Sequence, residues 1–143
     1  MMKGQALGLL VIFNCILSLA TAFRSQSVWA TGKLLCGTKP ASSVYVKLVD
    51  KDRAPNPDDL LDSSNTNATG HFNLMGDSIE MSDIDPEIRI YHDCNDYNKP
   101  CQREWIIRIP DKYIFDGDIP QKPFDFGVLN LEVELENEYK KCT

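Results

Sequence analysis

The stretch that decides the fold is Asp85-Pro-Glu-Ile-Arg-Ile-Tyr-His-Asp-Cys94, followed after a short loop by Cys101-Gln-Arg-Glu-Trp-Ile-Ile-Arg-Ile-Pro110. Each arm alternates between apolar and polar residues and is rich in Ile, Tyr and Trp, which predicts two half-buried strands. The apolar faces are Ile88, Ile90, His92 and Cys94 in the first arm and Trp105, Ile107 and Ile109 in the second. The connection 95–100 consists of turn formers, so we predict a hairpin whose apolar face the rest of the chain covers.

Further alternating stretches separated by turn residues predict the other strands. They are Val28–Cys36 with a possible bulge at Gly32, Val44–Asp50, a polar edge strand at Leu60–Asn65, His71–Met75 and a short strand at Asp111–Phe115. We expect a loose segment at Phe23–Ser27. No stretch after the first residues has a sustained helical period. About seven or eight short strands of this kind predict an all-β fold, a two-sheet antiparallel sandwich.

The last strand contains an irregularity. Phe124, Phe126 and Val128 occupy even positions, whereas Leu129, Leu131, Val133 and Leu135 occupy odd ones. A regular strand cannot place both sets on one face. We therefore predict a bulge or break near Gly127, where glycine permits the required backbone geometry. The alternative is that both faces of the strand are covered there.

The first 22 residues have the pattern of a secretory signal peptide. Lys3 supplies the positive charge, Leu7–Leu19 the apolar segment, and Ala20-Thr-Ala22 the small residues before the cleavage site. The apolar segment is shorter than the roughly 20 residues that a membrane-spanning helix needs. We expect cleavage after Ala22, which leaves residues 23–143 as one soluble, secreted domain.

The charge of this mature chain limits its partners. Without Lys3, 14 basic residues remain against 21 acidic ones, so the net charge is 14 − 21 = −7. This balance disfavours nucleic acid and direct docking on anionic membranes. No phosphate-cradling glycine loop and no His-Glu-x-x-His or Gly-x-Ser-x-Gly motif occurs, so we expect no cofactor.

The cysteines indicate two disulfides. Cys15 leaves with the signal peptide, and the four cysteines that remain form an even set in a secreted chain. Four cysteines allow three connectivities. Because Cys94 and Cys101 flank the hairpin turn, we predict that they pair with each other and that Cys36 pairs with Cys142. The spacing does not match a zinc site.

Several motifs together resemble the nematode transthyretin-like family of small secreted proteins. They are Gly32-Lys-Leu-Leu-Cys36, Thr69-Gly-His-Phe72, Tyr91-His-Asp-Cys-Asn95, Ile109-Pro-Asp-Lys-Tyr113 and Phe126-Gly-Val-Leu-Asn-Leu-Glu132. The resemblance implies a transthyretin-like sandwich and an extracellular setting, without a settled activity. The six residues between Cys94 and Cys101 leave no room for the helix of vertebrate transthyretin, and the paired cysteines favour a monomer.

Few residues are candidates for chemistry. The hydroxyisourate hydrolases of this fold end in Tyr-Arg-Gly-Ser, whereas this chain ends in Tyr139-Lys-Lys-Cys-Thr143, so we expect no catalytic residues. We interpret His92 as a buried histidine hydrogen-bonded near a disulfide and His71 as a surface residue. The acidic clusters at 50–62 and 80–87 match no recognised calcium loop, so we expect a solvated charged surface and no metal site. Asn67-Ala-Thr69 is a glycosylation sequon on an expected exposed turn.

These observations favour a non-enzymatic extracellular binding or adaptor protein. Its expected partner is a secreted or cell-surface protein, or a lipid if calcium or a local basic patch assists. Loops carry function more often than cores, and the candidates are Lys51–Asp59, Gly76–Asp85 and Asp116–Lys122. The alternative is a carrier of a small apolar ligand in a transthyretin-like pocket, which requires such a pocket.

Overall fold

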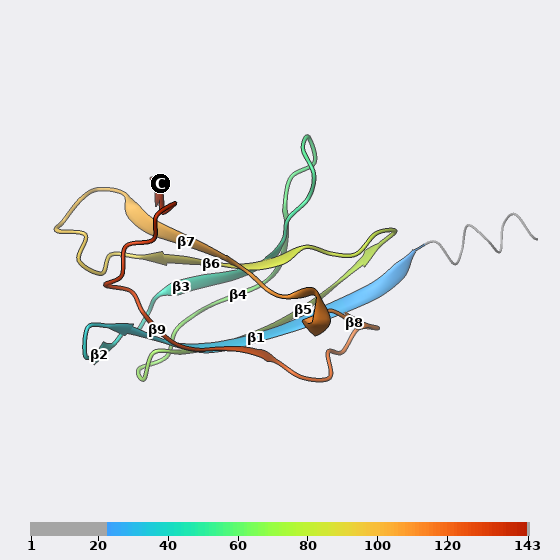
Figure 1. The fold of residues 1–143 in the computed structure, drawn as a ribbon, viewed down its shortest axis with the longest axis horizontal. Coiled ribbons are helices and arrows are strands. Elements are labelled where there is room, and N and C mark those ends of the chain that lie inside the picture. The colour runs from blue at the N-terminus through green and yellow to red at the C-terminus, as the bar shows by residue number, and fades with distance from the viewer. Residues whose placement is uncertain (1–22, 143) are drawn as a thin grey trace, which may run out of the picture.

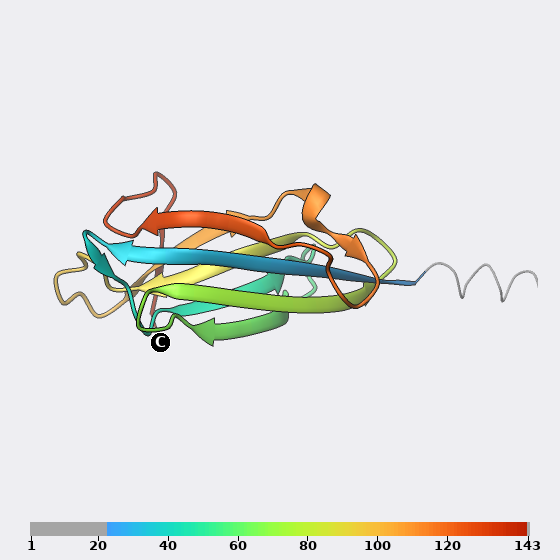
Figure 2. The ribbon, with the colours of Figure 1, turned by 90° about the horizontal axis from the view of Figure 1, so that it is seen from below.

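The computed structural model describes residues 23–142, which form two five-stranded sheets packed face to face (Figures 1 and 2). In the first sheet β1 (Arg24–Cys36) pairs with all the other strands, which are β2 (Lys39–Pro40), β5 (His71–Glu80), β8 (Phe115–Asp116) and β9 (Phe124–Asn130). The second sheet has the order β10 (Tyr139–Lys141), β7 (Gln102–Arg108), β6 (Pro86–His92), β3 (Tyr45–Asp50) and β4 (Asp59–Asn65). The predicted all-β sandwich is therefore confirmed. The predicted signal peptide lies outside the described residues.

The predicted hairpin forms the middle of the second sheet. β6 and β7 are antiparallel, with Ile90 opposite Trp105 and His92 opposite Arg103. Their apolar faces pack against the inner face of β1 and β5, so the hairpin is covered by the first sheet. The residues of this core with no exposed surface are Val28, Ala30, Leu34, Val46, Leu48, Leu74, Ile88, Ile90, Ile109 and Leu131. Burying each large aliphatic side chain contributes about 1.5–3 kcal/mol relative to exposure.

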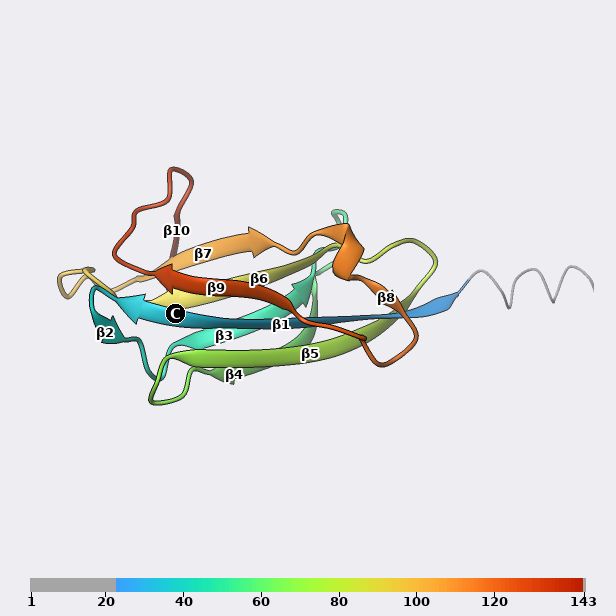
Figure 3. The ribbon, with the colours of Figure 1, turned by 60° about the horizontal axis from the view of Figure 1, so that its bottom comes forward.

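The predicted irregularity at Gly127 is confirmed as a bulge. Thr31 lies opposite Asp125, but Lys33 lies opposite Val128, so β9 has one residue more than β1 between these pairs. Gly127 adopts φ +69°, a region that favours glycine. The extra residue lets Phe126 and Leu129 both pack against the core although their positions differ in parity. Unlike the antiparallel pairing that the sequence led us to expect, β9 runs parallel to β1 (Figure 3).

Three predicted boundaries are wrong. The segment expected to be loose at the start is the beginning of β1, because Gln26 and Ser27 pair with both β5 and β8 and are buried. The acidic segment after Gly76 continues β5 as far as Glu80, because it pairs with this part of β1. The expected strand after Pro110 is a single 3-10 turn, η1 (Asp111–Tyr113), followed by β8. Within residues 23–142, no helix is long and apolar enough to cross a membrane.

Both disulfides are present, but the predicted pairing is wrong. Cys36 is bonded to Cys94 and Cys101 to Cys142, with Cα–Cα distances of 5.8 Å and 4.4 Å. The chain leaves the hairpin ladder after His92, and Asn95 has a positive φ of 53°, so Cys94 turns inward toward the end of β1. The first disulfide therefore links the two sheets, and the second fixes β10 to β7. On the chain-entropy model each contributes roughly 4 kcal/mol.

A buried arginine holds the hairpin loop and the C-terminal segment together. Arg103 in β7 is 3% exposed, and all five of its N–H groups are used. Its guanidinium donates to the carbonyl oxygens of Cys94 (2.7 Å), Leu131 (2.8 Å) and Val133 (2.8 Å). It also donates to both carboxylate oxygens of Glu138 at 2.5 and 2.7 Å, and this bond pulls the pKa of Glu138 down to about 2. Charge-assisted, two-pronged bonds of this kind are the strong ones in proteins.

We expect Arg103→Lys to lower the free energy of unfolding by about 3 kcal/mol. Lysine keeps the charge but has a single nitrogen, so it leaves buried carbonyl oxygens and part of the Glu138 carboxylate unpaired. Urea unfolding under oxidising conditions measures the loss. The control is Arg108→Lys, at an arginine whose side chain is 62% exposed and pairs with Asp85 and Asp111. It should change stability much less than Arg103→Lys does, because exposed ion pairs contribute little. Equal losses in the two variants would contradict the role assigned to Arg103.

Candidate binding site at the acidic end of the sandwich

An open pocket of about 890 Å³ lies at the end of the sandwich where β1 begins. Residues from the loop between β3 and β4 form one wall, and residues from the end of β5 and the following loop form the other. These are two of the three loops that the sequence singled out. The third, Asp116–Lys122, does not line the pocket but contacts the start of β1 beside it, where Arg24 pairs with Asp116 (3.5 Å).

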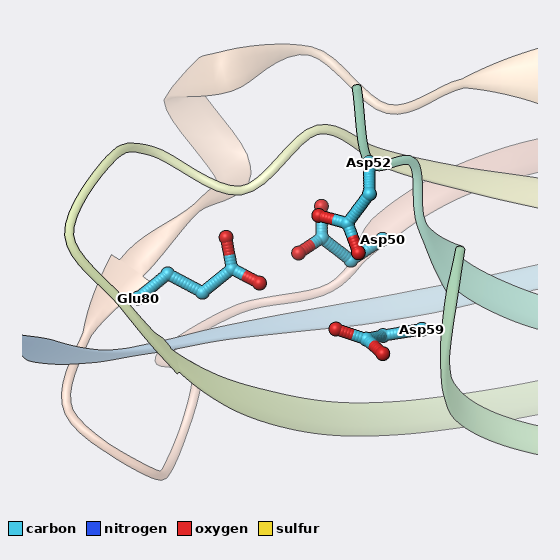
Figure 4. A group of neighbouring side chains, drawn as sticks. All are labelled: Asp50, Asp52, Asp59 and Glu80. Carbon is cyan, nitrogen blue, oxygen red and sulfur yellow. The ribbon is translucent and has the colours of Figure 1, made fainter. Parts of the chain in front are cut away.

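Four carboxylates meet at this pocket: Asp50, Asp52, Asp59 and Glu80 (Figure 4). One oxygen from each lies within 4.8 Å of those of the others. Asp50 ends β3, Asp59 begins β4 directly opposite it, and Glu80 ends β5. Like charges placed opposite each other across a strand pair destabilise a sheet. The four clustered carboxylates therefore destabilise the fold unless a positive group neutralises part of their negative charge.

Asp50 is the most unusual member of the group. Its side chain is 1% exposed, and its Oδ1 accepts a hydrogen bond from the backbone N–H of Asp85 at 2.7 Å. Its Oδ2 is buried and has no hydrogen-bond partner. Leaving a buried charged oxygen unpaired costs several kcal/mol, because the water that solvated it in the unfolded chain is lost.

The repulsion between the carboxylates raises the pKa values of two of them, Glu80 and Asp52. Burial and the negative charges of Asp50, Asp52 and Asp59 raise the pKa of Glu80 to about 7. Loss of solvation and repulsion from Asp50 and Asp59 also raise the pKa of Asp52. Chemically, such a group can share a proton or bind a cation, since either would relieve the repulsion.

Three arginines around the pocket are paired with carboxylates outside the cluster, whereas Lys51 and Arg53, which line the pocket, form no ion pair among residues 23–142. Arg89 contacts Asp58 and Glu87, each at 2.5 Å, and Arg108 contacts Asp85 at 2.6 Å. Arg24 is paired with Asp83. Among residues 23–142, no ion pair connects a basic side chain to any of the four clustered carboxylates.

Polar contacts hold the two walls in place, and those of Gln26 are buried. Gln26 of β1 is 1% exposed; its Nε2 donates to the carbonyl oxygen of Ser82 at 2.8 Å, and its Oε1 accepts from the N–H of Ile84 at 3.0 Å. In the opposite wall, the N–H of Asp52 donates to Asp58 Oδ1 at 3.0 Å. The carboxylates are thus carried by segments with fixed backbones.

The sequence led us to expect a solvated charged surface here, and for Asp50 that is wrong. The two acidic runs looked separate because Glu80 lies thirty positions after Asp50 in the sequence. They meet because β5 continues to Glu80 beneath the β3–β4 pair. The other acidic residues have ordinary roles: Asp62 accepts from the N–H of Met75 at 3.0 Å, and Glu87 pairs with Arg89.

The two histidines and the sequon lie outside the pocket. His92 is 3% exposed, and its Nδ1 accepts from the N–H of Cys94 at 3.1 Å, so the predicted buried histidine beside a disulfide is confirmed. His71 is exposed, as predicted. Asn67 is exposed on its turn, and its Oδ1 accepts from the N–H and the hydroxyl of Thr69 at 3.1 and 2.9 Å.

Comparison with known proteins agrees with the motifs. The model of the transthyretin-like family matches residues 31–110. The chain belongs to this family. It is 43% identical to transthyretin-like protein 46 of Caenorhabditis elegans over 134 residues, which cover 93% of this chain and 75% of that protein. It is also 43% identical to transthyretin-like protein 5 of the same organism, with 93% and 97% covered.

One solved structure, a 9R-lipoxygenase from Cyanothece PCC8801, matches 73% of this chain and 16% of its own length at 27% identity. Its TM-score of 0.42 is too low to show a shared fold. The resemblance to the transthyretin-like family that the sequence motifs indicated is confirmed by the family match and the relatives.

We expect His92 to make the protein less stable in mild acid. Its burial and the nearby positive Arg103, opposed by Glu138, Asp93 and Asp96, lower its pKa to about 4. In the unfolded chain the pKa is about 6.5, so between these values only the unfolded chain binds the proton. The free energy of unfolding should therefore fall by about 3 kcal/mol on account of this group as the pH drops from 6.5 to 4.

Urea unfolding of the wild type and of His92→Asn at pH 7.0 and 4.5 measures the contribution of His92 to the pH dependence of stability. The asparagine Oδ1 can still accept from the N–H of Cys94 but does not titrate. The contributions of other titrating groups are the same in both proteins and cancel. One of them is Glu80, whose raised pKa favours the folded state as the pH falls. A variant with the same pH dependence as the wild type would contradict the assignment.

Glycosylation at Asn67 stays a prediction. In material secreted from a eukaryotic host, glycopeptide mass spectrometry should find a glycan on Asn67, and Thr69→Ala should abolish it. Unmodified Asn67 throughout such material would rule it out.

Proposed function

We propose that the mature chain is a secreted, non-enzymatic binding protein that contacts an extracellular or cell-surface protein with the acidic end of the sandwich. The observation that supports the proposal is that two separate loops, both attached to the strands of the sandwich, meet at one open pocket. Binding residues are commonly placed on loops that a scaffold holds in position.

The rim of this pocket supports binding to a macromolecule. Phe23, Ile79 and Met81 line it and are 57%, 67% and 64% exposed. Exposed apolar side chains beside charged ones are a common composition of protein interaction surfaces, where a few large residues supply most of the binding energy.

Two disulfides support an extracellular setting. Such bonds persist in oxidising compartments and are rare in the cytosol. The signal-peptide pattern of the first residues agrees with secretion.

The chemistry of the pocket favours binding over catalysis. Its lining includes neither histidine nor cysteine, and these residues most often provide the base and the strong nucleophile in enzymes. The carrier alternative has less support, because ligand sites for small apolar molecules are mainly apolar, whereas this pocket is lined mostly by charged residues.

We expect the fluorescently labelled mature protein to bind saturably to cells of the producing organism, and Ile79→Asp to weaken that binding about 10-fold or more. The reason is that a charge would replace an apolar contact at the rim. Flow cytometry over a concentration series measures the affinity. The matched control is Tyr97→Asp, at a residue that is 82% exposed in the hairpin loop at the other end.

Equal weakening by the two substitutions would contradict the placement of the binding surface. Binding that survives protease treatment of the cells would contradict a protein partner.

A further inference from the structure

We propose that Asp50, Asp52, Asp59 and Glu80 form a calcium-binding site at the mouth of the acidic pocket. Their carboxylates point toward a common space (Figure 4). The proposal goes beyond the proposed function, because a bound ion is a property of this chain alone and does not require a partner.

The geometry suits a calcium ion. Calcium binds six to eight oxygens at about 2.3–2.6 Å, so two ligand oxygens on opposite sides of one ion lie up to about 5 Å apart. The four carboxylate oxygens are all within 4.8 Å of one another. One ion at the centre can therefore reach all four, and water or further oxygens can fill the open side of the pocket.

Asp50 independently indicates a missing ligand. Its carboxylate points toward those of the cluster (Figure 4), and its Oδ2 is buried and has no hydrogen-bond partner in the part of the chain that the structure describes. Its other oxygen is held by the N–H of Asp85, so the side chain is already oriented before any ion arrives. A cation beside Oδ2 would supply the interaction that the protein does not.

The distribution of charge points the same way. Lys51 and Arg53 line the pocket, but no ion pair among residues 23–142 joins either to a clustered carboxylate. Three other arginines are engaged by carboxylates outside the cluster: Arg89 by Asp58, Arg108 by Asp85, and Arg24 by Asp83. These pairs fix the walls and leave the inner carboxylates for another positive group. A divalent cation would neutralise half of their formal charge.

The ligand types select among metals. All four donors are carboxylate oxygens, which suit hard cations, whereas zinc sites are built mainly from histidine and cysteine. Magnesium demands a near-ideal octahedron at about 2.0–2.1 Å and usually retains several waters. Four carboxylates on three separate segments favour the more adaptable calcium.

A proton is the competing explanation. Protonated Glu80 could donate to Asp50 and satisfy Oδ2, and the raised pKa of Glu80 is compatible with this. However, one proton removes a single charge and leaves Asp52 and Asp59 beside the buried Asp50. The two explanations differ in a measurable way, because only an ion site responds to calcium at constant pH.

The test uses the mature, disulfide-bonded protein after treatment with a chelator. Urea unfolding at pH 7.4 is measured with no added metal, with 5 mM CaCl2 and with 5 mM MgCl2 at matched ionic strength. Extracellular calcium modules have Kd values of about 10⁻⁴–10⁻³ M, so calcium should lower the unfolding equilibrium constant roughly 5- to 50-fold. Isothermal titration should give one ion per chain.

Two variants and a control locate the ion. Asp50→Asn keeps the oxygen that accepts from Asp85, and Glu80→Gln alters a half-buried residue whose replacement the fold tolerates more readily. Both should abolish the calcium response, and Glu80→Gln should unfold less readily than the wild type without metal because a repulsion is removed. The control is Asp77→Asn, an exposed carboxylate on the same strand as Glu80, which should retain the full response.

Absence of a calcium response in the wild type would overturn the proposal and leave the shared proton as the explanation. An equal response to magnesium would overturn the assignment to calcium. Loss of the response in Asp77→Asn to the same extent as in Glu80→Gln would show general charge screening and overturn the site.

Discussion

Strand β1 pairs with every other strand of its sheet, and its 13 residues connect the two ends of the sandwich. Near its start, Gln26 holds the loop that carries one wall of the acidic pocket. At its end, Cys36 is bonded to Cys94, two residues beyond β6 of the facing sheet. A strand constrained at this many positions cannot shift without breaking pairs along its whole length. The clustered carboxylates therefore cannot move apart simply by moving the first sheet, and their repulsion remains in the folded state.

The two ends of the molecule are stabilised by different means. At the disulfide end, Arg103 and the Cys101–Cys142 bond order a C-terminal segment that is mostly exposed and buries little apolar surface beyond Leu131. Hydrogen bonds and a covalent link replace hydrophobic burial there as compensation for the entropy of ordering the chain. At the acidic end, ion pairs hold the walls, but the carboxylates between them have no such compensation. The repulsion among the four clustered carboxylates lies at the end that has the acidic pocket.

The alternation of apolar and polar residues was enough to predict the hairpin and the bulge at Gly127, because both follow from which side of a strand each residue occupies. The disulfide pairing also depends on the path of the chain outside the strands. Continuing the β6–β7 register places Cys94 opposite Cys101, and continuing the β10–β7 register places Cys142 opposite the same residue. Only the departure of the chain from the ladder after His92, with the turn at Asn95, decides between them, and that depends on the position of β1. Arg103 was missed for a similar reason: its four partner residues, which accept five hydrogen bonds, come from segments that meet only in the folded chain.

The acidic cluster was beyond sequence analysis because three strand registers must be known before Asp50, Asp59 and Glu80 are neighbours. Once they are, Asp50 raises a question of stability. Asparagine at this position could keep the bond from the N–H of Asp85 without a buried charge, and natural proteins retain such costly groups mainly where function requires them. Exposed carboxylates need no such explanation, since water solvates them. Asp50 is 1% exposed, with an unpaired oxygen and three acidic neighbours. Its one hydrogen bond within the described chain does not need its charge, so that charge is best explained by a positive ligand that it binds.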